Sequence, residues 1–269
     1  MLEFSDGEFN LLRDHIKKTY GINLSNEKKT LVYSRLRSTV MELGLSSFSQ
    51  YYEMLKADKS GKIANEFINR ISTNHTFFMR EKDHFDYFSQ TVLPEIEKSS
   101  RSCFRLWCAA SSSGEEPYTL QILLKEYFDG KSYDTSMIAS DVSTKVLNIA
   151  YRGVYSKESL SAMPQDWVKK YFDICDEETC KVKDFVKKEV LFRRINLMDD
   201  DLEKTFSKKL HTIFCRNVMI YFDEETRDRL VEKMYNMLEV GGYLFIGHSE
   251  RLGLKTRFKY IMPAVYKKA

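Results

Sequence analysis

The stretch Phe104-Arg-Leu-Trp-Cys-Ala-Ala110, which runs directly into Ser111-Ser-Ser-Gly-Glu-Glu-Pro117, decides the fold class of this chain. A short, mostly apolar run ends in small residues, and a helical pattern of apolar positions follows at 118–128. Similar apolar runs at 135–139, 212–215 and 243–246 also alternate with helical patterns. Such alternation predicts an α/β domain with a doubly wound, Rossmann-like parallel sheet that carries helices on both faces. We expect 245–266 to complete the sheet with an antiparallel edge pair.

The residues before this sheet show helical patterns only. Ser5 and Glu8 form a capping box, and Gly21 ends the helix that they open. Three further helices follow by the same signals, so we expect a small all-helical domain over 1–72 and a second domain over 73–269, in which 81–98 is one connecting helix. The second helix is expected to start near 25–26 and to stop at Gly44, the third to start at a capping box at 47–50, and the fourth to follow Gly61. The residues expected to face inward are Phe9, Leu12, Ile16 and Tyr20 in the first helix, Val32, Leu36, Val40 and Leu43 in the second, and Ile63, Phe67 and Ile71 in the fourth.

Composition excludes several classes of function. The chain has 42 Lys and Arg against 39 Asp and Glu, and a formal charge of +3 is too weak and too evenly spread to indicate a nucleic-acid partner. No stretch approaches the ~18 consecutive apolar residues of a membrane span, and the acidic N-terminal residues do not resemble a secretory signal. We therefore expect a cytoplasmic protein with no membrane insertion.

Cysteines and histidines give no metal signal. The five cysteines are odd in number and contain no CxxC pair, which favours reduced structural thiols over a zinc site. The five histidines never stand four residues apart, as the simplest helical zinc motif requires. The sequence therefore predicts no metal.

The turn after the first strand indicates the charge of a ligand. Small residues at 109–114 let a ligand approach the backbone, but Glu115 and Glu116 at the helix start disfavour a phosphate. Asp141 ends the second strand, where doubly wound folds use an acid to bind ribose hydroxyls. Adenosine with a cationic tail suits these acids, and S-adenosylmethionine is the common cofactor of that description. Two structural interpretations of these acids remain open beside ligand binding. Asp141 could cap the helix that follows it, and Glu115 and Glu116 could stabilise the positive end of the helix dipole.

Several motifs in order along the chain carry a family resemblance. They are Thr73-Asn-His-Thr-Phe-Phe-Met-Arg-Glu81, Trp107-Cys-Ala-Ala-Ser-Ser-Ser-Gly-Glu-Glu-Pro-Tyr118, Ala139-Ser-Asp141, Asn196-Leu197, Phe214-Cys-Arg-Asn-Val-Met-Ile-Tyr-Phe222 and Gly247-His-Ser-Glu250. Together they resemble the motifs of CheR-type chemotaxis receptor methyltransferases, over nearly the whole chain. One mild departure is the 111–113 stretch, all serine here, where family members often have Ala or Cys, Ser and Thr.

The resemblance implies an S-adenosylmethionine-dependent O-methyltransferase. It would esterify glutamate side chains on the cytoplasmic helices of methyl-accepting chemotaxis receptors and release S-adenosylhomocysteine. Arg80 and Tyr221 would stand nearest the transferred methyl group and serve catalysis. The cofactor site would take Asn74, Thr76, Arg80, Glu115, Glu116, Asp141, Asn196, Leu197, Arg216 and Asn217.

This chemistry needs no general base, because a glutamate with a pKa of ~4.3 is already ionised at neutral pH. The enzyme has to align the carboxylate with the sulfonium methyl group and to remove part of its water. Arg80 suits the binding of a carboxylate, and Tyr221 suits its orientation. The residues alone leave other readings open, with Arg80 as a surface residue and Tyr221 as part of the core.

The resemblance also implies how a receptor docks. Lys28 and Arg35 share a face of the second expected helix, and the corresponding basic helix meets the receptor in the family. Without the resemblance, the charges would indicate only a solvent-exposed helix face. Some relatives bind a receptor C-terminal pentapeptide through a glycine-containing loop of a small β subdomain. No glycine occurs between Gly153 and Gly241, so we expect binding that does not depend on this peptide.

Two other classes of protein remain as alternatives. A cofactor-sensing module on the same fold would not need Arg80 and Tyr221. A nucleic-acid methyltransferase would need a basic, aromatic-rich track and an Asn/Asp-Pro-Pro-Tyr-like string, which the sequence lacks.

Overall fold

The computed structural model describes residues 2–99 and 103–269, which form two compact units. Unit 1 comprises Met1–Thr73 and Tyr221–Thr226, and unit 2 comprises Asn74–Ile220 and Arg227–Ala269. Within the described ranges, every helix is too short or too polar to cross a lipid bilayer.

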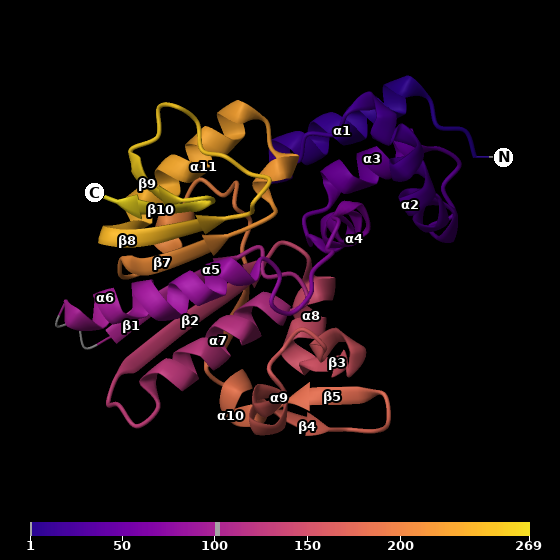
Figure 1. Ribbon diagram of the computed structural model, residues 1–269. Helices are drawn as coiled ribbons and strands as arrows, with labels where there is room; N and C mark the ends of the chain where they lie inside the picture. The colour runs from indigo at the N-terminus through magenta and orange to yellow at the C-terminus, as the bar shows by residue number, and fades with distance from the viewer. Residues whose placement is uncertain (1, 100–102) are drawn as a thin grey trace. The chain divides into compact units, whose positions relative to one another are not determined.

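Unit 1 is built from helices whose ends follow local sequence signals (Figure 1). Ser5 Oγ accepts a hydrogen bond from the Glu8 amide at 3.2 Å, and the Glu8 carboxylate accepts one from the Ser5 amide at 2.9 Å, so the predicted capping box is confirmed. Gly21 ends this helix with φ +73°, and all four predicted inward positions are buried. The elements are α1 (Asp6–Tyr20), the 3₁₀ turn η1 (Asn26–Lys28), α2 (Lys29–Glu42), α3 (Phe48–Ala57) and α4 (Lys62–Ile71).

Four details of unit 1 differ from the sequence predictions. Leu43 is 44% exposed, because α2 stops at Glu42; Thr39 is buried instead. The second helix opens with a 3₁₀ turn, and Ile63 is only partly buried. Ser47 caps α3 through the Gln50 amide, but the Gln50 side chain accepts from the amide of Ser46, so the expected reciprocal box is not formed.

A segment far along the chain also belongs to unit 1. Phe222 forms an isolated antiparallel bridge with Ile22, and the Asn23 amide donates to the Tyr221 carbonyl at 2.7 Å. Lys17 pairs with Asp223 at 2.9 Å. The sequence division at 72–73 gave no indication of this segment.

Unit 2 contains a seven-stranded sheet with the order β6-β2-β1-β7-β8-β10-β9. Strands β6, β2, β1, β7 and β8 run parallel, and β10 runs antiparallel to both β8 and β9. The doubly wound fold and the antiparallel edge are thus confirmed; β6 is the strand that the sequence analysis missed. The strands are β1 (Cys103–Ala109), β2 (Asp134–Asp141), β6 (Val190–Arg194), β7 (Leu210–Cys215), β8 (Leu238–Ile246), β9 (Phe258–Met262) and β10 (Val265–Lys268).

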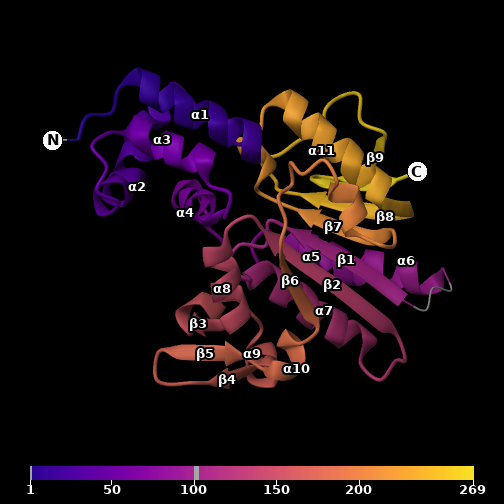
Figure 2. The ribbon, with the colours of Figure 1, turned by 180° about the vertical axis from the view of Figure 1, so that it is seen from behind.

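Helices cover both faces of this sheet. Helices α5 to α7 lie in front of the sheet in Figure 1, and Figure 2 shows α11 on the other face. The expected connecting helix is continuous through a π turn, and its Phe88 packs against Phe104, Phe214 and Phe245. The helical elements are α5 (Lys82–Tyr87), η2 (Phe88–Val92), α6 (Leu93–Lys98), α7 (Glu115–Phe128), α8 (Thr144–Arg152), η3 (Glu158–Leu160), α9 (Gln165–Tyr171), α10 (Asp184–Lys187), η4 (Leu202–Thr205), η5 (Met219–Tyr221) and α11 (Glu224–Met237).

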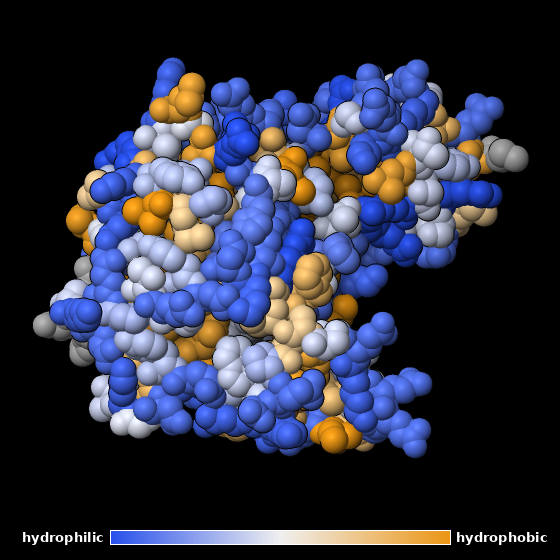
Figure 3. Space-filling view, in the orientation of Figure 1, coloured by the Kyte–Doolittle hydropathy of each residue, from blue (hydrophilic) through white to orange (hydrophobic). Residues whose placement is uncertain are grey.

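A second, small sheet projects from unit 2. Its strands β3 (Val154–Ser156), β4 (Phe172–Ile174) and β5 (Thr179–Val182) are antiparallel in the order β3-β5-β4. Ile174 is 75% exposed, and Figure 3 shows an apolar spot near β4 on a mostly hydrophilic surface. All five cysteines of the chain are free thiols, as predicted, although Cys175 next to β4 is exposed and not part of a core.

Candidate active site

The carboxyl ends of the parallel strands gather most of the predicted site residues. Strand order reverses between β1 and β7, since the chain proceeds from β1 outward to β2 and β6 and then returns to β7 on the other side. Ligands of doubly wound folds bind at this edge of the sheet, next to such a reversal. The residues there are Glu115 and Glu116 after β1, Asp141 at the end of β2, Asn196 and Leu197 after β6, and Arg216 and Asn217 after β7.

The turn between β1 and α7 is tight and strained. Ala110 and Ser112 have φ values of +63° and +49°, and Gly114 has +103°. A Cβ at Gly114 would lie 2.6 Å from the Tyr155 hydroxyl oxygen, so only glycine fits there. Helix α7 begins directly after this glycine, so Glu115 and Glu116 stand at the helix start as predicted, ahead of the apolar pattern at 118–128. The buried hydroxyl of Ser111 has no hydrogen-bond partner among the described residues.

Asp141 holds this turn to the end of β2. One carboxylate oxygen accepts from the Ser112 amide at 3.0 Å and the other from the Ser143 amide at 2.9 Å. Ser143, not Asp141, is the N-cap of α8, which removes the capping alternative. Burial raises the pKa of Asp141, although its backbone hydrogen bonds oppose the shift.

Glu115 and Glu116 have different surroundings. Glu115 accepts from the Ser113 hydroxyl at 2.7 Å, whereas Glu116 accepts from the Arg216 guanidinium at 2.8 Å and from the Cys108 thiol at 3.1 Å. Burial raises the pKa of both carboxyls, and the positive charge of Arg216 opposes this shift at Glu116. One of the two acids is therefore already paired with a cation.

Arg216 is the centre of a buried ionic cluster. Its side chain is 1% exposed, and besides Glu116 it binds Glu81 through Nη2 at 2.9 Å and Nε at 3.3 Å. The Asn217 side-chain amide donates to the other oxygen of Glu81 at 3.0 Å. Burial alone would raise the pKa of Glu81, but the bonds from Asn217 and Arg216 lower it below its ordinary value.

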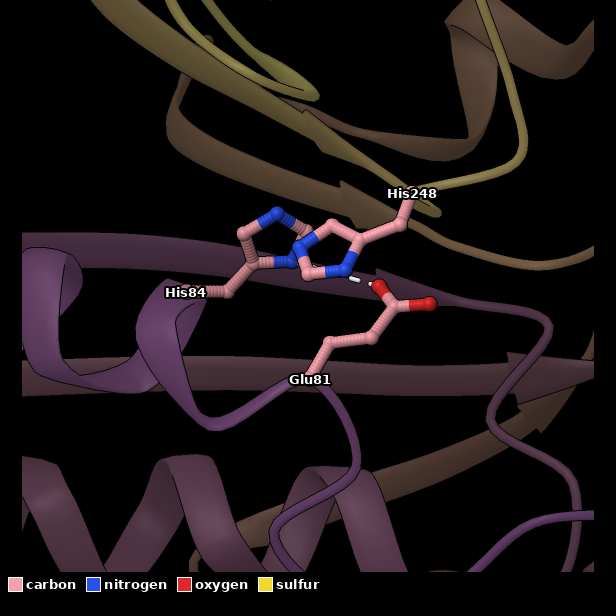
Figure 4. Close-up of side chains that lie close together, drawn as sticks. All are labelled: Glu81, His84 and His248. Carbon is pink, nitrogen blue, oxygen red and sulfur yellow. Dashed lines mark ion pairs between the residues drawn. The ribbon is translucent and has the colours of Figure 1, made fainter.

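Two histidine rings lie next to each other beside the Glu81 carboxylate (Figure 4). His84 is fully buried with Nδ1 at 3.5 Å from Glu81, and burial, aided by the charge of Arg216, lowers the pKa of His84 to about 4. The exposed His248 is 3.0 Å from Asp83. Glu81, His84 and His248 offer three metal-ligand atoms within 4.8 Å of one another. Both oxygens of Glu81 already accept from Arg216 and Asn217, so this group belongs to the ionic cluster and is not an open metal site.

The other predicted residues lie around these groups. Arg80 donates to the His75 carbonyl at 2.9 Å, and the Asn74 carbonyl accepts from the Ser112 hydroxyl at 3.0 Å, which ties the 74–81 segment to the β1–α7 turn. Thr76 is partly buried in the same segment. After β6, the Asn196 side chain accepts from the Met198 amide at 3.1 Å and Leu197 is buried. Tyr221 belongs to unit 1.

Sequence reasoning gave no role to two residues that the structure places here, Glu81 and Glu250. Glu250 is 6% exposed and accepts from the backbone amides of Gly247, Asn217 and Ile220. Both acids stand in motifs that carry the family resemblance. Their partners lie up to 136 residues away, so no local pattern indicates what they bind.

Comparison with protein families decides the identity of this arrangement. The model of the CheR methyltransferase SAM-binding domain matches residues 74–266, and the model of the CheR all-alpha domain matches residues 7–72. The chain belongs to the CheR methyltransferase family. The predicted resemblance, the S-adenosylmethionine cofactor and the methyltransferase activity are thereby confirmed.

Relatives match this CheR chain over nearly its full length. The chemotaxis protein methyltransferase of Borreliella burgdorferi is 40% identical over 273 residues, which cover 99% of this chain and 96% of that protein. Chemotaxis protein methyltransferase 2 of Pseudomonas aeruginosa is 37% identical over 246 residues, with 90% and 86% covered. The Escherichia coli chemotaxis protein methyltransferase is 32% identical over 269 residues, with 98% and 92% covered.

Proposed function

We propose that this CheR-family enzyme transfers the methyl group of S-adenosylmethionine to glutamate side chains on the cytoplasmic helices of chemoreceptors, and that it acts in the cytoplasm. The observation that carries the proposal is the concentration of buried and partly buried carboxylates at the carboxyl edge of the sheet. Glu81, Glu115, Glu116 and Asp141 outnumber the two guanidinium groups there, those of Arg216 and Arg80. Burial raises the pKa of the last three, so a ligand with a positive charge relieves an electrostatic cost that a phosphate would increase.

The residues present fit this cofactor. Asp141 accepts from the backbone amides of Ser112 and Ser143 and keeps further lone pairs, which suits a ribose diol. The hydroxyl of Ser111, which has no partner among the described residues, stands in the turn beside it. When bound, S-adenosylmethionine supplies an electrophilic methyl group on its sulfonium. We assign the cofactor site to the residues expected from the sequence, namely Asn74, Thr76, Arg80, Glu115, Glu116, Asp141, Asn196, Leu197, Arg216 and Asn217.

The receptor carboxylate is the nucleophile. Its oxygen forms the bond to the methyl carbon while the sulfur–methyl bond breaks and its electron pair stays on sulfur, which gives a methyl ester and S-adenosylhomocysteine. No proton moves, so a histidine base has no part, in agreement with the low pKa of buried His84. We assign the orientation of the carboxylate to Arg80 and Tyr221.

We propose that unit 1 docks the receptor through Lys28, the last residue of the 3₁₀ turn η1, and Arg35 of α2, although the sequence prediction placed both residues on one helix. Lys28 is exposed, whereas the Arg35 guanidinium binds the carbonyls of Ile71 at 2.5 Å and Ser72 at 3.2 Å, at the end of α4. Lys28→Ala is expected to weaken the fall of the methylation rate with salt, compared with the control Lys56→Ala on α3. An unchanged salt dependence would remove Lys28 from docking.

We also propose that receptor recognition does not depend on a C-terminal pentapeptide. The β4–β5 turn contains Asp176, Glu177 and Glu178, and Asp176 uses one carboxylate oxygen to accept the amides of Glu178 and Thr179. A peptide C-terminus brings a carboxylate, which a turn with three acids and occupied amides repels. Saturable heat on calorimetric titration of the free peptide would refute this proposal.

Radiolabelled S-adenosylmethionine and receptor-rich membranes test the central proposal. Label is expected in the receptor and should be released as methanol by alkali, as a glutamate ester requires. Arg80→Ala and Tyr221→Phe are expected to bind cofactor but to lose rate. Cofactor binding without transfer would indicate a sensing module, and label in nucleic acid would indicate the other alternative.

A further inference from the structure

Two residues in left-handed backbone conformations are joined by a hydrogen bond in unit 2. Glu81 has φ +56° and Asn217 has φ +58°, and the Asn217 side-chain amide donates to Glu81 at 3.0 Å. Such φ values are uncommon for residues other than glycine and cost free energy unless the surroundings enforce them. The two residues lie 136 positions apart, so a tertiary contact connects the two strained points.

The other oxygen of the Glu81 carboxylate accepts hydrogen bonds from Arg216. The buried guanidinium of Arg216 donates to it through Nη2 and Nε and reaches Glu116 only through Nη1. A buried cation that loses one of its anionic partners is strongly destabilised in that position. Without Glu81, Arg216 would keep the carboxylate of Glu116 and the carbonyl of Arg80, but its Nε would lose its acceptor and its Nη2 one of two, so its direction would be less well fixed.

Glu250 fixes the same loop in another way. It accepts the amides of Asn217 at 3.0 Å and Ile220 at 3.2 Å, so it holds the backbone of the loop after β7. Glu81 binds two side chains of the loop, the guanidinium of Arg216 and the amide of Asn217. Backbone and side chains of the loop are therefore held by different acids.

We infer that Glu81 is a positioning residue for the cofactor, which acts by aiming Arg216 and Asn217 without contacting the cofactor itself. The inference rests on the proposed function, in which these two residues line the S-adenosylmethionine site. Glu81 thus gives the 74–81 segment a role in the site beyond its expected contacts through Asn74, Thr76 and Arg80.

Calorimetric titration with S-adenosylhomocysteine tests this role. Glu81→Gln keeps the shape of the side chain but removes the charge opposite Arg216, and its dissociation constant is expected to rise by about 10- to 100-fold, the value of a charge-assisted hydrogen bond. Glu81→Ala also loses the acceptor for Asn217, so a larger increase is expected. The matched control is Asp83→Asn, the same type of charge removal two residues away, at a carboxylate that binds His248. Its dissociation constant should stay within about twofold of the wild type.

The titration separates positioning from folding. A higher dissociation constant with an unchanged binding stoichiometry, together with a raised KM for S-adenosylmethionine and a kcat within about threefold of wild type, supports the inference. A reduced stoichiometry with the wild-type dissociation constant would show misfolding only and overturn it, as would wild-type affinity in Glu81→Gln. If the wild type itself bound no S-adenosylhomocysteine, the proposed function would fail first.

Discussion

Replacing Gly247 by alanine is expected to drive the Asn217 side chain out of its place. A Cβ at 247 would lie 2.3 Å from Asn217 Nδ2, 2.9 Å from its backbone nitrogen and 3.0 Å from its Cγ. Glu250 holds that backbone nitrogen, so the backbone is not free to yield. The Asn217 side chain has to rotate, and it then loses its hydrogen bond to Glu81.

The size of the effect follows from these contacts. A hydrogen bond to a charged group is worth about 1.5–3 kcal/mol, and an added methyl group in a filled space costs about 1–3 kcal/mol. We therefore expect Gly247→Ala to lower the free energy of unfolding of unit 2 by roughly 3–5 kcal/mol. With an m value of about 2–3 kcal/mol per M, the urea midpoint should fall by about 1–2.5 M.

Tryptophan fluorescence reports this change in unit 2 alone, because both tryptophans, Trp107 and Trp167, belong to it. The matched control is Gly130→Ala, where φ is +71° but nothing lies within 4 Å of the new Cβ. Backbone strain alone costs about 1–2 kcal/mol there and should leave S-adenosylhomocysteine binding intact. The reasoning is refuted if Gly247→Ala unfolds at the wild-type urea concentration and binds the product with wild-type affinity.

Unit 1 offers three further predictions. Gly7→Ala in the first turn of α1 should stabilise the unit by about 0.4–1 kcal/mol in urea unfolding, because the new Cβ meets nothing nearer than the Ser5 hydroxyl at 3.9 Å; a loss of stability would show that the glycine has another role. The hydroxyl of Ser60, with backbone amides at the start of α4, lowers the pKa of Asp58 to about 2. Because the pKa of Asp58 in the folded protein lies below its value in the unfolded chain, ionised Asp58 stabilises unit 1 fully above about pH 5, and this stabilisation is lost as pH falls from about 4 toward 2. Asp58→Asn should therefore flatten that part of a plot of the free energy of unfolding against pH. Arg35→Ala should destabilise unit 1 by about 1–2 kcal/mol in thermal or urea unfolding, because α4 loses its cap, whereas Lys28→Ala should have no effect; equal effects would contradict the capping role.

Capping residues and apolar spacing predicted the helices of unit 1 well, but they failed at the C-terminal end of α2. The capping box at Ser5 and the left-handed Gly21 act within one helical turn, so the residues themselves specify them. Leu43 fits the apolar spacing of α2 but is exposed, because the helix ends before its position completes the inward face. The spacing of apolar residues predicts which face of a helix is buried, but it does not predict the residue at which the helix ends.

The strands show the same difference. The apolar runs predicted β1, β2, β7 and β8, since strands buried on both faces are apolar throughout. The edge strand β6 (Val190–Arg194) is mostly exposed and ends in two arginines, so it has no such run. Its pairing with β2 is what makes it a strand.

What the sequence determined by itself is the order of strands and helices, their caps, and the fact that Glu115, Asp141 and Arg216 follow strand ends and so reach one edge of the sheet. Only the tertiary structure decided their partners. Glu116 pairs with Arg216 across 100 positions and Glu81 with Arg216 across 135. Helix and strand signals arise from interactions between close neighbours in the chain, whereas a buried ion pair depends on strand register and on the loss of water, which no short segment specifies.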